Sequence, residues 1–315
     1  MNTATKLRAR VSPEAISKPK PKPDVAQTIT DLILRKIEEG TAPWLKPWSA
    51  RSSRPLRHNG IAYTGINTFY LWAVAETTGY SSPYWMTYRQ AGELGGQVRK
   101  GECGSYSVFY SSARKTDTDG LTGEATERTI RFMKWNHVFN AGQIDGLPAH
   151  YYPEPPDPRA IGELSANIRN FLDAIPIKVK HGGGSAHYTP GNDTVTLPHP
   201  EVFHSIEGYF STRCHELGHA TGHPSRLNRH FGKRFGDDAY AFEEIVASLT
   251  QATLCAEYGL PNELHDSHAS YIDHWAKILR ADKTAILHAA AKADQAVKWL
   301  RQFDPALAEP AREAA

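Results

Sequence analysis

Two histidines and a glutamate in the second half of the chain have the spacing of a metal-binding helix. His215 and His219 stand four residues apart in the run CHELGH, and Glu216 directly follows the first of them. One helical turn aims both imidazoles at a single ion, and the glutamate then lies where it can take a proton from an attacking water. A chain with 15 histidines in 315 residues contains this pattern by chance only about 0.04 times. The sequence therefore predicts a Zn²⁺ site with Glu216 as the catalytic base.

A catalytic zinc ordinarily has three protein ligands and one water, so a third ligand must come from elsewhere. His223 is one candidate, but the usual third histidine lies two residues further along. Glu244 shares a polar stripe with Ser248 and Gln251 on an otherwise apolar helical run, whereas Glu243 has apolar neighbours on its face. We predict Glu244 as the third ligand, with Glu243 and His223 as alternatives. A set of two histidines and a glutamate also accepts other divalent metals.

Helical spacing and turn residues predict the elements that position this site. The motif lies in a predicted helix over residues 205–221, and the candidate glutamates lie in a second predicted helix over residues 238–259. A helix is also predicted over residues 161–175, and the C-terminal region is predicted to be helical. The run AHYTPGNDTVTLP predicts a hairpin with the turn PGND. Its second strand either presents an edge on which an extended peptide can pair or serves as a wall of the core.

The front half has its own predicted elements. Apolar residues at helical spacing predict a first helix over residues 24–40, and a short helix is predicted near residues 86–96. The runs SYSVFY and TIRFMKWNHVFN predict the two strands of a hairpin with a long tip. Residues 147–159 contain five prolines in thirteen positions, a density that helices and central strands do not tolerate. This segment is therefore predicted to join two domains.

We predict an α+β protein with two domains. The expected parts are a disordered basic arm (1–23), an N-terminal α+β domain (24–147), a proline-rich linker (148–158), a C-terminal domain with the metal motif (159–303) and a tail (304–315).

The composition excludes several classes of protein. No run approaches the roughly 18 consecutive apolar residues of a membrane span, and the N-terminus lacks the apolar centre of a secretory signal. Cys103, Cys214 and Cys255 are an odd number without CxxC spacing, so neither a disulfide framework nor a thiolate metal site is indicated. We therefore expect a cytoplasmic protein with no membrane partner.

Charge is distributed unevenly between the two halves. Residues 1–148 hold 20 Lys and Arg against 13 Asp and Glu, whereas residues 149–315 hold 16 against 21. A surplus of cations in the front half favours a polyanionic partner. Basic residues alternate there with aromatic residues in the run PWLKPWSARSSRPLRHNGIAYTGIN. Cations follow phosphates and aromatic rings stack on unpaired bases, so this mixture indicates single-stranded nucleic acid.

The chain resembles the ArdC family of antirestriction proteins of conjugative plasmids from about residue 24 to residue 300. The front half resembles the family's single-stranded DNA-binding domain, which also occurs in plasmid primases of the TraC type. Its matching stretches are PWLKPW, YTGIN, SPYWMTYRQAGELGGQVRKGE and VFNAGQIDGLP. The back half resembles the family's zincin-like metallopeptidase domain through CHELGHATGHPSRLNR and AYAFEEIVASL.

This resemblance implies protection of incoming plasmid DNA from the recipient's restriction enzymes during conjugation. By motif position it assigns the metal site to His215, Glu216, His219 and Glu244. The basic or stacking residues in the family-like stretches are our predicted DNA contacts: Lys46, Arg57, Tyr63, Asn67 and Lys100. The chain departs from the family pattern at Ser248, where an acidic residue would orient a zinc-bound histidine, so we expect weaker support of the ligands here.

Two functions from different classes fit these features. The first is a binding protein that coats single-stranded DNA and thereby protects it, with double-stranded DNA and a host restriction-enzyme subunit as further candidate partners. The second is a DNA-localised zinc metallopeptidase that cleaves a protein bound to the same DNA. In the first function the metal domain is structural or contacts the restriction-enzyme subunit, and the sequence alone does not separate the two functions.

Overall fold

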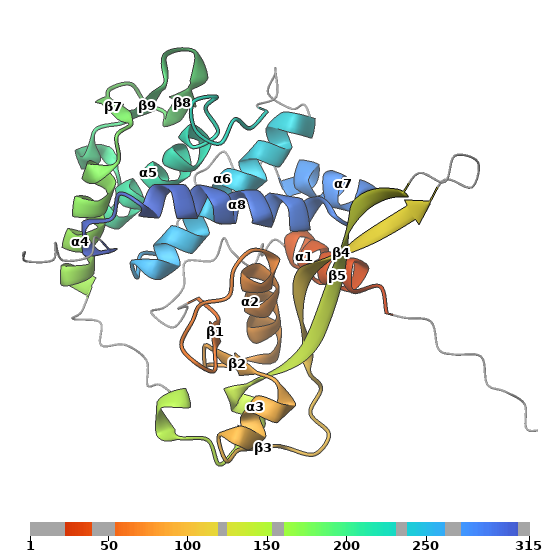
Figure 1. Cartoon of the computed structure of the whole chain (residues 1–315). Helices are drawn as coiled ribbons and strands as arrows, with labels where there is room; N and C mark the ends of the chain where they lie inside the picture. The colour runs from red at the N-terminus through yellow and green to blue at the C-terminus, as the bar shows by residue number, and fades with distance from the viewer. Residues whose placement is uncertain are drawn as a thin grey trace, which may run out of the picture.

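The computed structural model describes residues 23–39, 54–118, 125–152, 161–230, 238–261 and 272–307. These residues form the expected α+β fold, with helices and three small sheets (Figure 1). The predicted basic arm, Lys46 and most of the predicted tail lie outside the described residues. Within the described ranges no helix is both long and apolar enough to cross a membrane.

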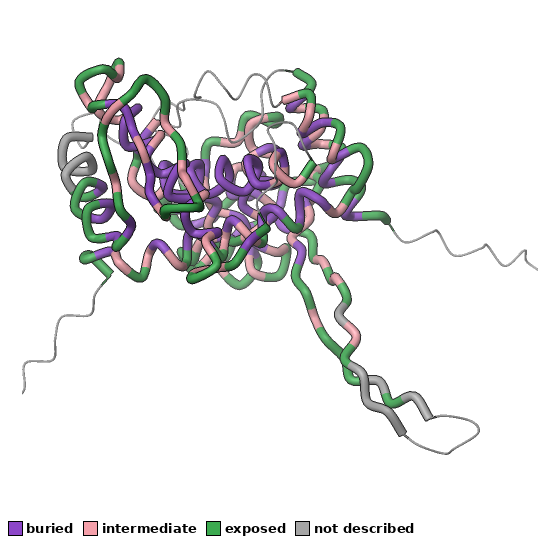
Figure 2. The backbone as a smooth tube through the Cα atoms, turned by 90° about the horizontal axis from the view of Figure 1, so that it is seen from above, coloured by how far each residue is buried: buried purple, intermediate pink, exposed green. Residues whose placement is uncertain are grey.

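The front half is built around a four-stranded sheet with the strand order β1-β2-β5-β4. The predicted hairpin is confirmed and is longer than expected, with Ser105 paired to Val138 near its base. It projects from the body as a ribbon with mostly exposed residues (Figure 2). The elements of this sheet and the two helices beside it are α1 (Val25–Glu38), β1 (Leu56–Arg57), α2 (Ile66–Thr78), β2 (Tyr84–Met86), β4 (Ser105–Thr118) and β5 (Ala125–Asn140).

A small second layer lies at the base of the hairpin. It contains α3 (Tyr88–Glu93) and a two-stranded sheet of β3 (Gln97–Val98) and β6 (Ile144–Asp145). The side chain of Thr87 accepts a hydrogen bond from the backbone of Gln90, whose side chain bonds back to Thr87, and this capping box starts α3. The layer has its own apolar core, and Tyr151 from the predicted linker is buried in it.

The back half contains a three-stranded sheet and five helices among its described residues. The strand order is β7-β9-β8, so β9, which carries TVTL, is central and pairs on both sides. Of the two alternatives for this strand, the edge is excluded and the wall of the core fits, because Val195 and Leu197 are buried. Strand β8 is an edge strand instead, and it contacts α5. The elements are α4 (Ile161–Ala174), β7 (Lys178–His181), β8 (His187–Thr189), β9 (Thr194–Leu197), α5 (Ile206–Ala220), α6 (Asp238–Glu257), α7 (Ile272–Ala281) and α8 (Ala285–Arg301).

Helices α5 and α6 cross closely at Gly218. A Cβ atom at this position would lie 3.2 Å from the Ala247 Cα atom and 3.3 Å from the Thr250 Cβ atom. Because Gly218 has no side chain, the backbones of α5 and α6 can approach each other. This close approach allows a residue of α6 to reach the two histidines of CHELGH. The motif helix itself starts at Ser205, whose side chain accepts a hydrogen bond from the Gly208 backbone.

The two halves share one apolar core. The largest cluster of buried residues joins α1, α2 and strands of the front half to α6, α7 and α8, and it includes Ile29, Ile33, Ile245 and Trp275. Helix α1 contacts α7, and α2 contacts α8. The hydroxyl of Thr30 donates to the carbonyl of Lys283 at 2.7 Å. The front and back halves are thus packed against each other over several helices.

Candidate metal centre

Three side chains from α5 and α6 converge on one point. His215, His219 and Glu244 each offer a ligand atom, and these atoms all lie within 4.8 Å of one another. The Nε2 atoms of the two histidines are 3.1 Å apart. One carboxylate oxygen of Glu244 lies 3.4 Å from Nε2 of His215, and the other lies 3.4 Å from Nε2 of His219. A cluster of two imidazoles and one carboxylate could hold a divalent ion such as zinc.

Each histidine is oriented from behind by a different partner. The Oε1 atom of Gln251 lies 3.2 Å from Nδ1 of His215, and the Gln251 amide in turn donates to the hydroxyl of Ser211 at 2.8 Å. Because an amide oxygen only accepts, Nδ1 of His215 must carry the proton, which leaves the Nε2 lone pair facing the cluster. For His219 the equivalent partner is Glu243, whose Oε1 lies 3.5 Å from Nδ1. Both imidazoles therefore present Nε2 to the same point.

Glu243 is held by a buried arginine. The Arg229 Nη2 atom lies 2.6 Å from Glu243 Oε1, and Nε lies 2.9 Å from Oε2. Arg229 also donates to the Thr221 hydroxyl and the Gly218 carbonyl, both at 2.7 Å. Sequence reasoning missed this role of Arg229, although the residue ends the family-like stretch CHELGHATGHPSRLNR. No pattern in the sequence marks this arginine as buried, because its position depends on the turn after α5.

The electrostatics of the cluster favour a positive charge. Burial lowers the pKa of His219, but the charge of Glu244, hydrogen bonds to Glu243 and Glu244, and the charge of Glu216 raise it to about 10. Burial raises the pKa of Glu244, but His219 and His215 lower it by more than burial raises it. The pKa of Glu244 therefore lies below its usual range. The buried carboxylates thus stabilise a cation between the two helices, which is the condition that a divalent ion also needs.

Glu216 lies next to His215 on α5 but is not one of the three residues of the cluster. It is buried on α5, and its charge acts on His219. No residue that the structure describes forms a hydrogen bond with its carboxylate. A carboxylate with free lone pairs next to a metal ligand can accept a proton, which is what the predicted role as a base requires.

The alternative third ligands are occupied elsewhere. His223 accepts a hydrogen bond from the Ser225 backbone and lies 2.7 Å from the Ser225 hydroxyl, so it stabilises the turn after α5. Glu243 is committed to Arg229, as described above. We expected weaker support of the histidine ligands because Ser248 stands where the family has an acidic residue. In the structure Gln251 and Glu243 lie beside the Nδ1 atoms of the two histidines and supply that support. The Ser248 hydroxyl is buried and has no hydrogen-bond partner among the described residues.

Two of the predicted DNA contacts, Tyr63 and Asn67, are engaged within the protein. Lys100 and Arg57 are exposed, and the Arg57 guanidinium lies over the Tyr63 ring at 5.4 Å. Tyr63 itself is only 5% exposed and belongs to the shared core, so its ring has no free face on which a base could stack. Asn67 exchanges two hydrogen bonds with the backbone of Val108 and thereby anchors β4 to α2. We therefore leave Tyr63 and Asn67 out of any DNA-binding surface.

Arg54, which lies in the basic and aromatic run, is also not a surface cation. It is buried, forms an ion pair with Glu257 at the end of α6, and donates to the Tyr63 carbonyl at 2.6 Å. Arg301 at the end of α8 lies 3.4 Å from the same glutamate. Arg54 thus joins the front half to the back half, and composition alone could not distinguish this role from phosphate binding.

Two protein families match the chain, one in each half. Residues 23–139 match the N-terminal domain of anti-restriction factor ArdC, and residues 166–292 match a zincin-like metallopeptidase. Among curated proteins, uncharacterized protein y4eC of Sinorhizobium fredii is 35% identical over 284 residues, which are 88% of this chain and 91% of that protein. A DNA primase TraC of Escherichia coli is 35% identical over 298 residues. That match covers 88% of this chain but only 27% of the primase.

Two solved structures agree with these matches. The metal-free crystal structure of the antirestriction ArdC protein from plasmid R388 is 41% identical, with a TM-score of 0.75, over 89% of this chain and 98% of that one. The Mn(II)-bound crystal structure of that protein is 40% identical, with a TM-score of 0.72, over 90% and 99% of the two chains. Such identity over almost the whole of both chains, in the same order of domains, means that this chain belongs to the ArdC family of antirestriction proteins.

Proposed function

We propose that this protein protects incoming plasmid DNA from restriction by binding its single strands through the front half. The observation that carries the proposal is the match to the R388 antirestriction protein, which extends over 98% of that chain. The distribution of charge supports DNA as the partner, because the cation surplus lies in residues 1–148. Double-stranded DNA and a restriction-enzyme subunit are secondary candidates.

For the back half we propose a divalent metal site formed by His215, His219 and Glu244. The donor set fits zinc, and the orientation of both Nε2 atoms by Gln251 and Glu243 supports a ligand role. The R388 relative has been crystallised with Mn(II), and a set of this kind also accepts that ion. A bound metal would supply a Lewis acid that polarises a carbonyl, while Glu216 would take the proton of the attacking water.

A second candidate function is proteolysis by this metal site. It is favoured by the position of β8, an edge strand that contacts the motif helix α5. An extended peptide could pair with such an edge and bring its scissile bond to the cluster. Occupancy of DNA requires no cleavage, so we place proteolysis second.

The test is a conjugation assay into a restricting recipient, run beside DNA binding in vitro. Full-length protein is used, because the shared core makes the separate halves unsuitable. We expect tighter binding to a labelled single strand than to the duplex of the same sequence, and affinity that falls as salt rises. Protein that protects the plasmid but binds neither DNA form would contradict the occupancy proposal.

A further inference from the structure

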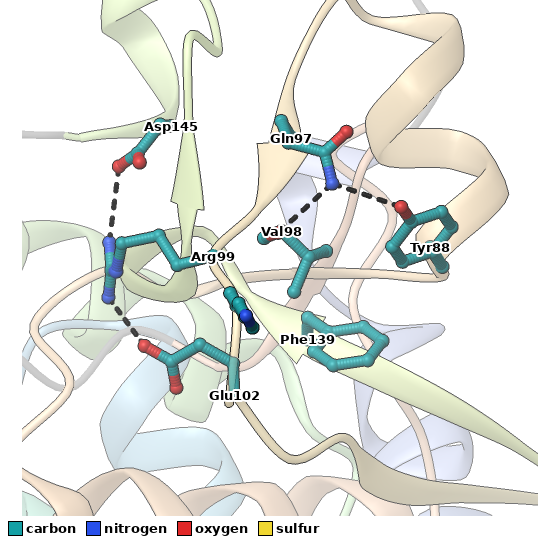
Figure 3. A pocket seen from close by; sticks show the side chains of 8 residues that line it. Tyr88, Gln97, Val98, Arg99, Glu102, Phe139 and Asp145 are labelled. Carbon is teal, nitrogen blue, oxygen red and sulfur yellow. Dashed lines mark hydrogen bonds and ion pairs between the residues drawn. The ribbon is translucent and has the colours of Figure 1, made fainter.

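A pocket of about 540 Å³ opens in the second layer of the front half, at the base of the projecting hairpin. This volume is within the range of roughly 300–1,000 Å³ that is usual for small-molecule sites. One wall is aromatic, formed by Tyr88 of α3 and Phe139 of β5 (Figure 3). The opposite wall carries Arg99, Glu102 and Asp145. The pocket belongs to the front half, whereas the metal cluster belongs to the back half.

The aromatic wall offers a free ring face that is held in position. The Tyr88 side chain is 58% exposed, and its ring meets Phe139 edge to face with centroids 6.4 Å apart. The Gln97 amide donates to the Tyr88 hydroxyl and to the Val98 carbonyl, both at 3.0 Å. Tyr88 is also the first residue of α3 and lies between Thr87 and Gln90, the two residues of the capping box. A fixed and exposed ring of this kind suits a planar ligand.

The charged wall holds one cation between two carboxylates, so it carries an excess of one negative charge. Arg99 lies 2.8 Å from Glu102 and 3.3 Å from Asp145, and it donates to the Gly142 carbonyl at 2.6 Å. Because the Arg99 guanidinium is bound to these partners, this wall does not form a binding site for an anion. Its carboxylate oxygens keep further lone pairs, which can accept hydrogen bonds from the amino groups of a ligand.

Lys100 is the remaining cation of the pocket. It is exposed, and no residue that the structure describes pairs with its ammonium group. Arg99 is engaged by the two carboxylates, so Lys100 is the lining cation that can contact a single negative charge of a ligand. A phosphodiester carries one such charge, whereas a free phosphate group carries about two.

The frame around the pocket is tightly packed. A Cβ atom at Gly96 would lie 2.6 Å from the side chain of Leu147, and one at Gly104 would lie 2.9 Å from the side chain of His137 and 3.1 Å from Phe139. Glycine at these two positions lets β3 lie against β6 and lets the chain pass beside the aromatic wall. A frame of this kind preorganises the pocket and lowers the cost of ordering a ligand.

We propose that this pocket holds one unpaired nucleotide of a DNA strand, with its base against Tyr88 and Phe139 and its phosphate on Lys100. This proposal rests on the single-stranded DNA binding proposed above and adds a site of contact that the predicted residues did not include, apart from Lys100. The base stacks on the exposed ring, and the polar side chains opposite meet its edge. Adjacent nucleotides continue past the rim, because the pocket is open.

The test measures binding of the full-length protein to a fluorescent single-stranded oligonucleotide and to an abasic strand of equal length. Tyr88→Ala is expected to weaken binding to the strand with bases by about tenfold, because stacking on one ring is lost. Tyr88→Phe keeps the ring and should bind almost like the wild type. On the abasic strand Tyr88→Ala should change nothing. Tyr110→Ala is the matched control, since this tyrosine is 61% exposed on the hairpin and lies outside the pocket.

Lys100→Ala tests the phosphate contact. It should weaken binding to both strands and reduce the slope of log affinity against log salt by about 0.7, the value for one phosphate of a single strand. Lys178→Ala, an exposed lysine in the back half, is the control for the same loss of charge. If the wild type binds the strand and Tyr88→Ala binds it equally well, the pocket proposal is wrong while the proposed function stands. If the wild type binds no single strand, both are wrong.

Discussion

The Glu243 carboxylate lies between Arg229 and His219 and connects a loop beyond α5 to the metal centre. One of its oxygens is 2.6 Å from the Arg229 guanidinium and 3.5 Å from Nδ1 of the His219 imidazole. The angle at which His219 faces the cluster therefore depends on a residue ten positions further along the chain.

We expect Glu243→Gln to lower metal affinity by about 10- to 100-fold, as the loss of an outer partner of a histidine ligand commonly does. Glutamine keeps the shape of the side chain, but it removes the charge that holds both Arg229 and His219. Competition with a fluorescent zinc chelator measures the effect. Arg213→Met is the control, because Arg213 is a buried arginine of α5 that pairs with Asp173 instead. Unchanged affinity in Glu243→Gln would mean that His219 is oriented by other contacts.

Gly218→Ala should destabilise the fold by about 1–3 kcal/mol, because the added methyl group has to push apart two packed helices. The same displacement moves Glu244 away from the histidines, so metal affinity should fall as well. Gly92→Ala is the helical control, since a Cβ atom there meets nothing within 4 Å. That change should be neutral or stabilising by up to about 1 kcal/mol. Urea unfolding of the metal-free proteins compares the two, and equal midpoints would refute the close-approach argument.

Glu216→Ala should keep the metal, single-strand binding and most of the protection, because DNA occupancy does not use a general base. Elemental analysis and the conjugation assay measure these outcomes. His215→Ala combined with His219→Ala should lose the metal and serves as the comparison. Loss of protection in Glu216→Ala, with normal folding and normal DNA binding, would instead make proteolysis the function.

Arg54→Met should destabilise the protein by about 3 kcal/mol, because it leaves Glu257 partly buried without its nearest cation. Arg57→Met, three residues along, changes an exposed cation and should leave stability within about 0.5 kcal/mol. DNA binding should respond in the opposite way, with the larger loss in Arg57→Met. Unfolding curves and anisotropy titrations on the same two variants test this. An Arg54→Met protein that is fully stable but weak in DNA binding would contradict the buried role.

Stability should depend on the ion pair between Asp193 and Arg226 above about pH 4. The Arg226 guanidinium, against the opposing effect of burial, holds the pKa of Asp193 down to about 2 from its usual 3.8. A lowered pKa stabilises the folded state above the unfolded value, and this contribution is lost as the pH falls from about 4 towards 2. Because a third of the side chain is exposed, we expect only about 1 kcal/mol. Asp193→Asn should therefore differ from the wild type at pH 7, and by about half as much at pH 3.

The sequence predicted the helices that show a periodic apolar stripe and the hairpins that show alternation. Helix α1, the motif helix α5 and the long hairpin are confirmed, although the hairpin strands extend further than the apolar runs do. Helix α2 was missed because apolar residues surround it on most sides, so no single stripe marks it. The central position of β9 was also missed, because strand order depends on packing between segments far apart in the sequence.

The cluster of His215, His219 and Glu244 was predictable because its spacing follows helical geometry and the polar stripe on α6 pointed to the right glutamate. The support from Arg229 was not, since it arises from a turn that folds back under α5. Among the predicted DNA contacts, basic and aromatic composition could not reveal which side chains are buried. The predicted contact Tyr63 and, in the same basic and aromatic run, Arg54 have the residue types of a nucleic-acid surface but lie in the interior, where they hold the two halves together.

The core that joins α1 and α2 to α6, α7 and α8 means that neither half has a complete interior without the other. In the Escherichia coli primase the match includes 88% of this chain as one block within a much longer protein. A recombination event at the proline-rich segment would release two chains, each lacking one wall of its interior. Residues such as Ile33 and Trp275 would then face water, at about 25 cal/mol for each Å² of apolar surface exposed. Gene fusions that carry the whole block keep both walls and avoid this cost.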